Sequence, residues 1–474
     1  MHIYQNFINN KFTGQTEGNS LDVMDPATED LVAKVTLATV SEATSAVDAA
    51  ASAQKTWGKL PSIERARYLQ KFADALEAHT EHIAASLAKE SGKSLRDAAD
   101  ETHYAAEILR YHSEWARRIE GEVIPSDSPS ENLFLIREPI GVAACLIPFN
   151  YPVYTLLRKI APALITGNTV VARPSNKTPC SALEIAKAAL AADLPAGVIN
   201  ILATTNAVSE PLCTHPKVGM ISLTGSVAVG RKVLEYAQVN MARHSLELGG
   251  KTPAIIEADA NWKHAASDIA AAKLVHCGQR CTAIERVYVQ ESLYADFVQL
   301  LKAHFIAQKY GNRAQDAHLM GPLASAEARQ HIHQMVTHAL AEGAHLETGG
   351  FIPEGKGFFY PPTLLTQCRQ EMEIVQEETF GPVLCVLKYK TAEEALALAN
   401  DHQFGLASVL YSENYRTILY FANQIEAGEL YINRTPADPY QGYHAGWKRS
   451  GLGGDDGKHG MLEFTQTRLV VMKY

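Results

Sequence analysis

Hydrophobic and polar positions change their spacing several times along the chain. The first eleven residues alternate between polar and apolar side chains, and Asn9-Asn10 can turn a hairpin there. Helical spacing follows in the ranges 41–57, 62–90 and 94–120, and the second range begins at a cap-like serine behind a proline. The beginning of the chain is therefore expected to hold a hairpin and three helices.

Between residues 121 and 139 the pattern becomes extended, polar and proline-containing, and it alternates over residues 132–136. Residues 464–474, at the end of the chain, alternate as an edge strand does. Such edges carry unpaired backbone groups that accept a further strand. We expect residues 121–139 to form a protruding arm that pairs with the tail, within one chain or across a subunit boundary.

From Gly141 onward, short apolar strands alternate with helices. The expected strands are 142–147, 169–173, 198–202, 220–223 and 245–248, with helices at 155–166, before 192 and at 229–239. Strands joined by helices of about 10–15 residues form parallel, doubly wound sheets, which bind ligands at the carboxyl ends of their strands. A second α/β series begins near residue 251 and runs to about residue 447.

Composition narrows the class of protein. The 474 residues, 46% apolar and 20% charged, suit a globular protein with full-sized cores. A net charge of -9 argues against general affinity for nucleic acid or an anionic membrane, since no basic excess exists. Apolar runs end well short of the ~18 residues of a membrane helix. Seven irregularly spaced cysteines suit a reducing compartment, so a cytoplasmic location is expected.

Two tempting motifs fail on their own residues. The range 225–232 has the glycine spacing of a P-loop, but Arg231 and Lys232 occupy the positions that need Lys and Ser or Thr. His276, Cys277 and Cys281 lack a second ligand pair at zinc spacing. We expect neither a nucleoside triphosphate site nor a metal.

Three polar residues carry candidate chemistry. Cys281 follows Gly-Gln-Arg, and Glu247 stands in the run Leu-Glu-Leu-Gly-Gly-Lys. A thiol nucleophile and a carboxylate base are what covalent oxidation of an aldehyde needs. Asn150, in Pro-Phe-Asn-Tyr-Pro after the first parallel strand, can donate to an oxyanion beside the Cys281 backbone N–H, although the run taken alone favours a simple Asn-Tyr-Pro turn. A cysteine alone is often only a small buried hydrophobic residue.

Together and in this order, these runs resemble the aldehyde dehydrogenase superfamily. Further matches are Leu-Thr-Gly-Ser at 223–226, Glu-Thr-Phe-Gly-Pro at 378–382, the run 428–433 and the run 448–453. The resemblance extends from residues 25–28 to the C-terminal strand. It implies that Cys281 is the nucleophile, Glu247 the general base and Asn150 the oxyanion donor. Because acylating relatives commonly lack the base, it also implies hydrolysis of a thioester to the carboxylic acid.

The resemblance further implies a nicotinamide cofactor. The residues expected to contact it are Ile147, Pro148, Phe149, Arg173, Pro174, Ser175, Asn176, Gly225, Ser226, Glu378 and Phe380. Two positions depart from the family pattern, because Arg173 replaces Lys and Asn176 replaces a Glu that repels a 2′-phosphate. With Lys177 adding a cation nearby, either NAD or NADP is expected.

The C-terminal segments 431–434, 441–447 and 456–460 are most similar to the lactaldehyde/glycolaldehyde dehydrogenase branch. This similarity implies that Arg158, Asp438 and His444 line the aldehyde pocket. Alternatively, Arg158 pairs structurally with an acid and His444 caps a loop. Succinate semialdehyde, whose distal carboxylate Arg158 would bind, and small aldehydes in general remain alternative substrates. A non-catalytic binding relative is the alternative from another class.

The expected fold is α/β with three parts. Residues 1–120 and 140–249 form a Rossmann-like dinucleotide-binding domain, and residues 250–447 form an α/β catalytic domain that holds the nucleophile. Residues 121–139 and 461–474 form a small β oligomerisation arm, from which we expect a homodimer or homotetramer.

Overall fold

Eight strands form the larger sheet of the computed structural model, which describes residues 2–14 and 19–474. Their order is β22 (Gly451–Leu452), β12 (Arg243–Glu247), β11 (Val218–Thr224), β8 (Val142–Leu146), β9 (Thr169–Arg173), β10 (Ile199–Ile201), β2 (Asn6–Ile8) and β3 (Lys11–Thr13). The five strands from β12 to β10 run parallel. Each strand predicted between residues 142 and 248 is confirmed, with ends that differ by at most two residues.

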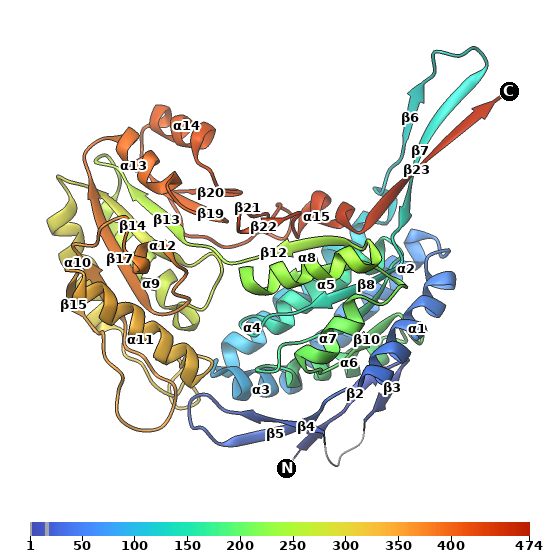
Figure 1. Ribbon diagram of the computed structural model, residues 1–474, viewed down its shortest axis with the longest axis horizontal. Coiled ribbons are helices and arrows are strands. Elements are labelled where there is room, and N and C mark those ends of the chain that lie inside the picture. Colours follow the sequence, from blue (N-terminus) through green and yellow to red (C-terminus); the bar gives the residue numbers. More distant parts are fainter. Residues whose placement is uncertain (1, 15–18) are drawn as a thin grey trace.

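Helices on both faces bury this sheet (Figure 1). The connecting helices are α5 (Pro152–Ile165), α6 (Cys180–Ala191), α7 (Asn206–Cys213) and α8 (Val227–Asn240). From β8 the chain continues to β9 and β10 on one side of that strand, and then crosses to β11 and β12 on its other side. The strand order therefore reverses between β8 and β11, where a doubly wound sheet opens a crevice.

The first N-terminal helix packs against the same sheet and the next three pack against α5 and α6. Two of their predicted ranges need correction, and one of these is 94–120, whose α-helix ends at Ser113. The helices are α1 (Val40–Trp57), α2 (Ser62–Ala78), α3 (Thr80–Ser91) and α4 (Leu95–Ser113), followed by the 3-10 turn η1 (Glu114–Arg117). The single helix predicted over 62–90 is wrong, because His79 leaves helical geometry and bonds the Ala75 carbonyl through Nδ1 at 2.8 Å. Side-chain bonds to a nearby backbone compete with helix continuation.

The first residues form three strands, which are divided between two sheets. The predicted hairpin is confirmed, since β2 and β3 pair around Asn9 and Asn10, whose φ values of 52° and 59° suit a tight hairpin turn. The strand before the hairpin, β1 (His2–Tyr4), belongs to a separate sheet of three strands, together with β5 (Leu31–Thr36) and β4 (Ser20–Met24).

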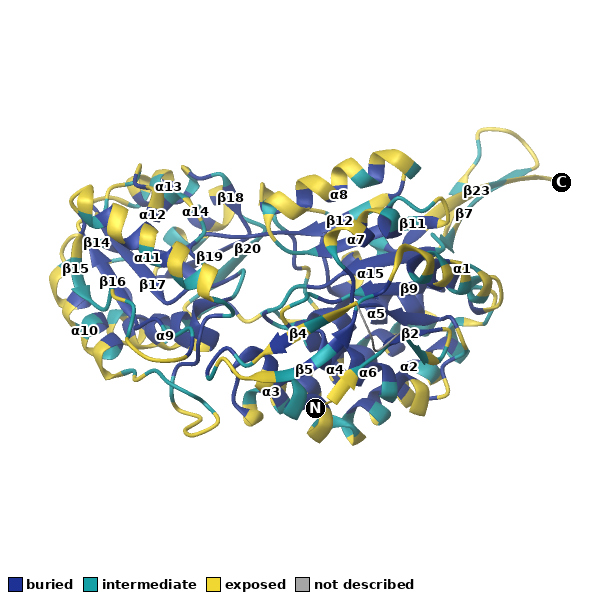
Figure 2. Ribbon diagram, turned by 60° about the horizontal axis from the view of Figure 1, so that its bottom comes forward, coloured by how far each residue is buried: buried dark blue, intermediate teal, exposed yellow. Residues whose placement is uncertain are grey.

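A second sheet of seven strands has its own apolar core. Its order is β15 (His345–Thr348), β16 (Thr363–Thr366), β17 (Val383–Tyr389), β14 (Ile284–Gln290), β13 (Thr252–Ile256), β19 (Ala407–Tyr411) and β20 (Glu429–Ile432). The helices around it are α9 (Trp262–Leu274), α10 (Tyr294–Ala307), α11 (Ala326–Ala341), α12 (Glu373–Gln376), α13 (Ala392–Asn400) and α14 (Tyr415–Gln424). Figure 2 shows the two sheets as separate buried layers. The expected α/β class is confirmed.

The C-terminal segment adds a strand to each of three sheets. First, β21 (Trp447–Lys448) pairs with β18 (Phe404–Gly405), and β22 then covers the edge of β12. After α15 (Gly457–Glu463), β23 (Thr465–Lys473) pairs antiparallel with β7 (Glu131–Pro139), which also pairs with β6 (Glu122–Pro125). This arm projects from the body (Figure 1), and the predicted pairing of tail and arm occurs within one chain. No helix in the described part of the chain has the length and apolarity needed to cross a membrane.

Candidate active site

The carboxyl ends of four neighbouring parallel strands bring most of the predicted residues to one edge of the larger sheet. Glu247 ends β12, Gly225 and Ser226 follow β11, and Asn150 lies shortly after β8. The segment 173–176 follows β9. Because parallel strands end on the same edge, residues from distant parts of the chain share one crevice there.

A sharp turn carries Cys281 to this edge from the second sheet. In η2 (Val275–Gly278), His276, Cys277 and Gly278 have φ values of 47°, 57° and 72°. A side chain at Gly278 would lie 2.2 Å from the Gly381 carbonyl oxygen, so glycine is required. The turn leaves Cys277 fully buried and Cys281 half-buried. Of these two thiols, Cys281 is the accessible one.

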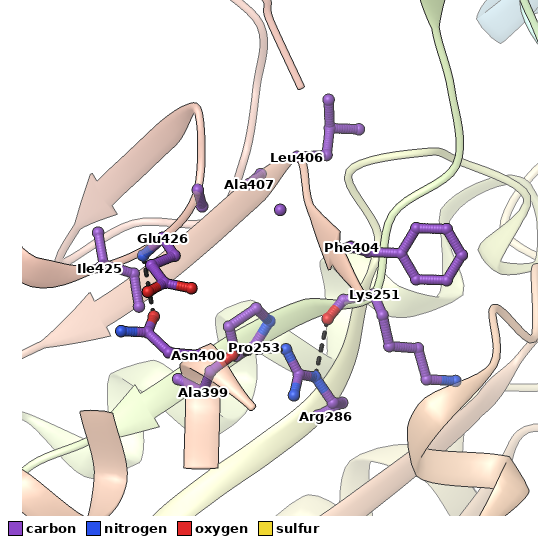
Figure 3. A pocket seen from close by; sticks show the side chains of 12 residues that line it. Lys251, Pro253, Arg286, Ala399, Asn400, Phe404, Leu406, Ala407, Ile425 and Glu426 are labelled. Atoms are coloured by element: carbon purple, nitrogen blue, oxygen red, sulfur yellow. Dashed lines mark hydrogen bonds between the residues drawn. The ribbon is translucent and has the colours of Figure 1, made fainter. Parts of the chain in front are cut away.

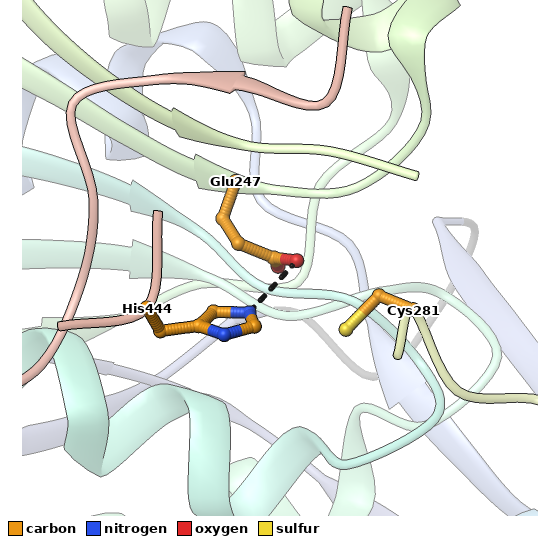
Figure 4. A group of neighbouring side chains, drawn as sticks. All are labelled: Glu247, Cys281 and His444. Atoms are coloured by element: carbon orange, nitrogen blue, oxygen red, sulfur yellow. Dashed lines mark ion pairs between the residues drawn. The ribbon is translucent and has the colours of Figure 1, made fainter. Parts of the chain in front are cut away.

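Cys281, Glu247 and His444 converge (Figure 4), with one donor or acceptor atom of each within 4.8 Å of the others. Glu247 Oε1 lies 3.2 Å from His444 Nε2. Burial and the Glu247 carboxylate raise the pKa of the Cys281 thiol to about 12, although His444 acts in the opposite direction. These side-chain types also occur at zinc sites, so the expected lack of a metal stays a prediction.

His444 is held between the two sheets. Its Nδ1 lies 2.8 Å from Oε1 of Glu429, at the start of β20, and its backbone exchanges hydrogen bonds with Asp455. Burial and Arg158 disfavour the imidazolium, but Asp438 and Glu429 outweigh them and raise the pKa of His444 well above its ordinary value. His444 thus has a carboxylate hydrogen-bonded at Nδ1 and a second carboxylate in charge contact near Nε2, and both favour the imidazolium.

Asn150 is fixed against the Cys281 loop. Its side-chain Nδ2 donates to the Gln279 carbonyl at 3.0 Å, and its own carbonyl accepts from Lys93 Nζ at 2.6 Å. Lys93 also pairs with Glu101 at 2.5 Å, and Glu101 accepts the backbone N–H of Val153 at the start of α5. The Asn150 side-chain amide is therefore fixed to the loop at Gln279, two residues before Cys281.

The three predicted substrate residues are brought together beside this cluster. Asp438 Oδ2 lies 3.7 Å from Arg158 Nη1 and 3.9 Å from His444 Nδ1. Arg158 is buried and also bonds Asp456 through Nη2, so structural pairing with an acid is observed as well. The Tyr154 ring lies 5.2 Å from the Arg158 guanidinium, and its buried hydroxyl has no hydrogen-bond partner among the described residues.

The predicted cofactor residues surround the crevice. Arg173 donates to the Thr204 carbonyl at 3.1 Å and reaches Asn176 Oδ1 at 3.5 Å. The ring of Phe149 stands edge-on to Phe380, with centroids 5.8 Å apart. Of the others, Ile147 donates to the Arg173 carbonyl, Pro174 is buried in the turn after β9, Ser175 Oγ accepts the Lys177 N–H, and Pro148 precedes Phe149.

Two further features fit a dinucleotide. Ser226 caps α8 by accepting the Val229 N–H at 3.4 Å, and this exposed helix start suits a diphosphate. Glu378 accepts the Gly250 N–H at 3.1 Å, and burial together with Glu285 raises its pKa to about 8. The residues present therefore fit a nicotinamide cofactor.

The sequence did not point to three residues of the site. They are Glu429, which bonds His444, Asp456, which pairs with Arg158, and Tyr154, whose ring lies beside Arg158. Glu429 and Asp456 stood inside runs that matched the family, but no local signal connected them with His444 or Arg158. Tyr154 stands one turn of α5 before Arg158, and this spacing was the one signal that could have found it.

A different concavity lies beside the second sheet (Figure 3). Arg286 Nε donates to the Lys251 carbonyl at 2.9 Å there, and Asn400 Oδ1 accepts the Glu426 N–H at 2.9 Å. None of the predicted catalytic residues lines it. Its polar groups are engaged in holding β13, β14 and α13 together, so it is a structural feature.

Comparison with known proteins agrees with this geometry. Residues 12–470 match the model of the family described as "Aldehyde dehydrogenase family". The chain belongs to the aldehyde dehydrogenase family. The expected cofactor is confirmed at the level of this family, and the chain is an NAD(P)-dependent oxidoreductase.

Relatives are similar over their whole length. The chain is 43% identical to lactaldehyde dehydrogenase of Escherichia coli (strain K12), over 96% of this chain and 95% of that protein. It is 35% identical to 3,6-anhydro-alpha-L-galactose dehydrogenase of Vibrio sp. (strain EJY3), with both chains fully covered. The crystal structure of E. coli lactaldehyde dehydrogenase superposes with a TM-score of 0.98 at 41% identity, with both chains fully covered.

Proposed function

We propose that this aldehyde dehydrogenase oxidises a small hydroxylated aldehyde, of the lactaldehyde or glycolaldehyde type, to its carboxylic acid. The observation that carries the proposal is the contact between two groups of residues. The nucleophile and base, Cys281 and Glu247, adjoin a buried polar cluster of Arg158, Asp438 and His444. An aldehyde held at Cys281 would place its neighbouring carbons against that cluster.

In the proposed cycle, Cys281 Sγ attacks the aldehyde carbon and forms a thiohemiacetal. Asn150 and the Cys281 backbone N–H donate to the oxyanion, and Asn150 Nδ2 has a second N–H for this besides the one bonded to the Gln279 carbonyl. When bound, the oxidised nicotinamide supplies the acceptor for the hydride that leaves the carbon. Glu247 then takes a proton from water, which attacks the thioester and releases the acid.

The cofactor site is proposed along the carboxyl ends of β8, β9 and β11, with Glu378 on the nicotinamide ribose and Phe380 near the ring. Arg173 and Asn176 would face the adenosine ribose, with Lys177 exposed next to them. No carboxylate occupies position 176 to repel a 2′-phosphate, and both cations attract one. We therefore propose that NADP is accepted alongside NAD.

The net charge around Arg158 and His444 favours a neutral aldehyde over an anionic one. Arg158 already pairs with Asp456 and lies 3.7 Å from Asp438, and His444 is flanked by Glu247 and Glu429. Four carboxylates therefore surround two cations, and a further carboxylate from succinate semialdehyde would meet net negative charge. Hydroxyl groups, which donate as well as accept, suit this pocket better. The name of the E. coli relative agrees with this choice.

One panel of substrates tests the proposal. Lactaldehyde, glycolaldehyde, succinate semialdehyde and propanal are each offered with NAD and with NADP, and cofactor reduction is followed by absorbance. We expect the highest kcat/KM with the two hydroxyaldehydes. A preference for succinate semialdehyde would assign the Arg158 cluster to a carboxylate, a preference for propanal would indicate a general small-aldehyde enzyme, and no turnover at all would favour a binding role.

We further propose that β6, β7 and β23 form an oligomerisation arm. Val123, Leu469 and Val471 on these strands are more than half exposed, which suits a sheet that a second copy covers. A dimer or tetramer would follow. For the location we propose the cytoplasm, where the seven free thiols stay reduced.

A further inference from the structure

His444 connects the nucleophile to a carboxylate of the second sheet. Its Nδ1 lies 2.8 Å from Glu429 Oε1, so the proton of the neutral ring belongs on Nδ1. The opposite nitrogen, Nε2, has no hydrogen-bond partner among the described residues, although it is fully buried. In Figure 4 the Cys281 sulfur points toward this ring from one side, and the Glu247 carboxylate reaches the same ring from above.

We propose that His444, oriented by Glu429, takes the proton of the Cys281 thiol and holds it beside the thiolate. In this arrangement His444 activates the nucleophile, and Glu247 is reserved for activating water later in the cycle. The three residues have the geometry of a nucleophile, a base and a group that orients the base. The inference rests on the proposed covalent role of Cys281 but on no particular aldehyde.

The charges around the thiol support this division of roles. Burial, Glu247 and Asp438 all raise the pKa of Cys281, and His444 is the group that lowers it. A second negative charge beside Glu247 is unfavourable, whereas an imidazolium stabilises a thiolate. The charged or titratable groups around His444 include Arg158, Glu247, Cys281, Glu429, Asp438, Asp455, Asp456, Tyr154 and Tyr431. The acids outnumber the one cation, so a proton is held on the ring.

The step balances without an external reagent. The S–H bond of Cys281 breaks, and its proton binds the lone pair of His444 Nε2. The sulfur electron pair forms the C–S bond, and the carbonyl π pair moves to oxygen, with no change in oxidation state. The new Nε2–H can then donate to the hydroxyl of the substrate or to Glu247, which lies 3.2 Å away. When the thioester is hydrolysed, the departing thiolate regains its imidazolium partner.

Alkylation of Cys281 by iodoacetamide tests the proposal without aldehyde or cofactor, because the thiolate is the reactive form. The rate is measured over about pH 5 to 10 by mass spectrometry of the Cys281 peptide. His444→Asn should move the profile upward by ~1 unit or more, so that labelling at neutral pH is ~10-fold slower or more. Glu429→Gln should move it in the same direction by less. Glu247→Gln should move it downward, since a repelling charge is lost.

Controls separate this role from a structural one. His459→Asn changes an exposed histidine of the same C-terminal segment and should leave the profile unchanged. Thermal melting shows which variants fold, and where His444→Asn does not, Glu429→Gln decides by the same profile. An unchanged profile in the folded variant, or slower labelling in Glu247→Gln, would overturn the proposal. The aldehyde panel does not enter this test, so a wrong substrate class and a wrong activator are distinguishable.

Discussion

Arg158 and Asp456 form a buried ion pair although 298 positions separate them in the chain. Both side chains are almost completely excluded from solvent, and burial raises the pKa of Asp456 while Arg158 lowers it. The pair joins α5, in the larger sheet's helical layer, to the segment that follows β22. It therefore fixes Arg158 beside Asp438, within the cluster that we propose to bind the substrate.

Stability should depend on this pair. Arg158→Leu leaves the Asp456 carboxylate buried without its cation, which typically costs about 3–5 kcal/mol. We expect a clearly lower melting temperature by calorimetry. Adding Asp456→Asn in the same chain should restore most of the loss. An equal loss in the double variant would show that packing of the guanidinium, and not the unpaired charge, sets the cost.

Substrate discrimination should depend on hydrogen bonds from the pocket. His444→Phe and Tyr154→Phe each remove a polar group, and a site built to bond a hydroxyl loses discrimination when its partner is missing. We expect kcat/KM for glycolaldehyde relative to propanal to fall by ~10- to 100-fold, or ~1.4–2.7 kcal/mol. Taking the ratio cancels any general loss of activity, such as slower activation of Cys281. A ratio that stays constant would assign both residues to structure alone.

The two cysteines of the nucleophile loop should behave differently. Cys281→Ala should abolish oxidation and leave cofactor binding intact, because the alanine keeps the backbone of the turn. Cys277→Ala should stay within about tenfold of the wild type in kcat, a barrier change of ~1.4 kcal/mol. Steady-state rates and cofactor titration by fluorescence measure both effects. Inactivity of Cys277→Ala with a normal Cys281→Ala would reverse the assignment.

Glu247→Gln should separate the two halves of the reaction. The amide cannot take a proton from water, so the thioester should accumulate after a single hydride transfer. A stopped-flow trace should show a burst of about one reduced cofactor per active site, followed by little turnover. The wild type, whose hydrolysis is intact, serves as control. Loss of the burst together with the steady state would place Glu247 before the hydride transfer.

Asn176→Glu should change the choice of cofactor. A carboxylate near the 2′-phosphate repels it, typically by a few kcal/mol in a partly buried site. We expect the KM for NADP to rise at least tenfold more than the KM for NAD, a difference of ~1.4 kcal/mol. Asn176→Gln is the matched control, because glutamine has the same length as glutamate but carries no charge. Equal changes for both cofactors would exclude contact with the phosphate.

Local patterns in the sequence were sufficient for much of the fold. The strand predicted at 169–173 agrees with β9 at both ends, because its apolar run is bounded by turn residues. The single helix predicted over 62–90 failed at His79, whose side-chain bond to Ala75 has no periodic signature. Periodicity detects which face is buried, and it does not detect side chains that interrupt a helix.

The site was predictable where residues follow strands, and unpredictable where they meet across the fold. Glu247 and Asn150 could be placed from their positions at the carboxyl ends of parallel strands. Glu429 reaches His444 only because β20 of one sheet lies beside the tail that covers the other. Such contacts depend on how the two sheets are arranged, and no spacing within either segment encodes that arrangement.

The C-terminal segment also sets the order of events during synthesis. Domains fold as they leave the ribosome, at ~5–20 residues per second, beginning with the N-terminal parts. Cys281, Glu247 and all seven strands of the second sheet are therefore made before β22, Asp456 and β23 exist. Until these emerge, the edge of β12 is uncovered, Arg158 lacks its partner, and β7 has only one neighbour. A chain that stops before β22 carries Cys281 and Glu247 but lacks Asp456 and the strand that covers the edge of β12. On the proposed mechanism, the residues that bond the aldehyde are therefore held in place only after these late segments have been made.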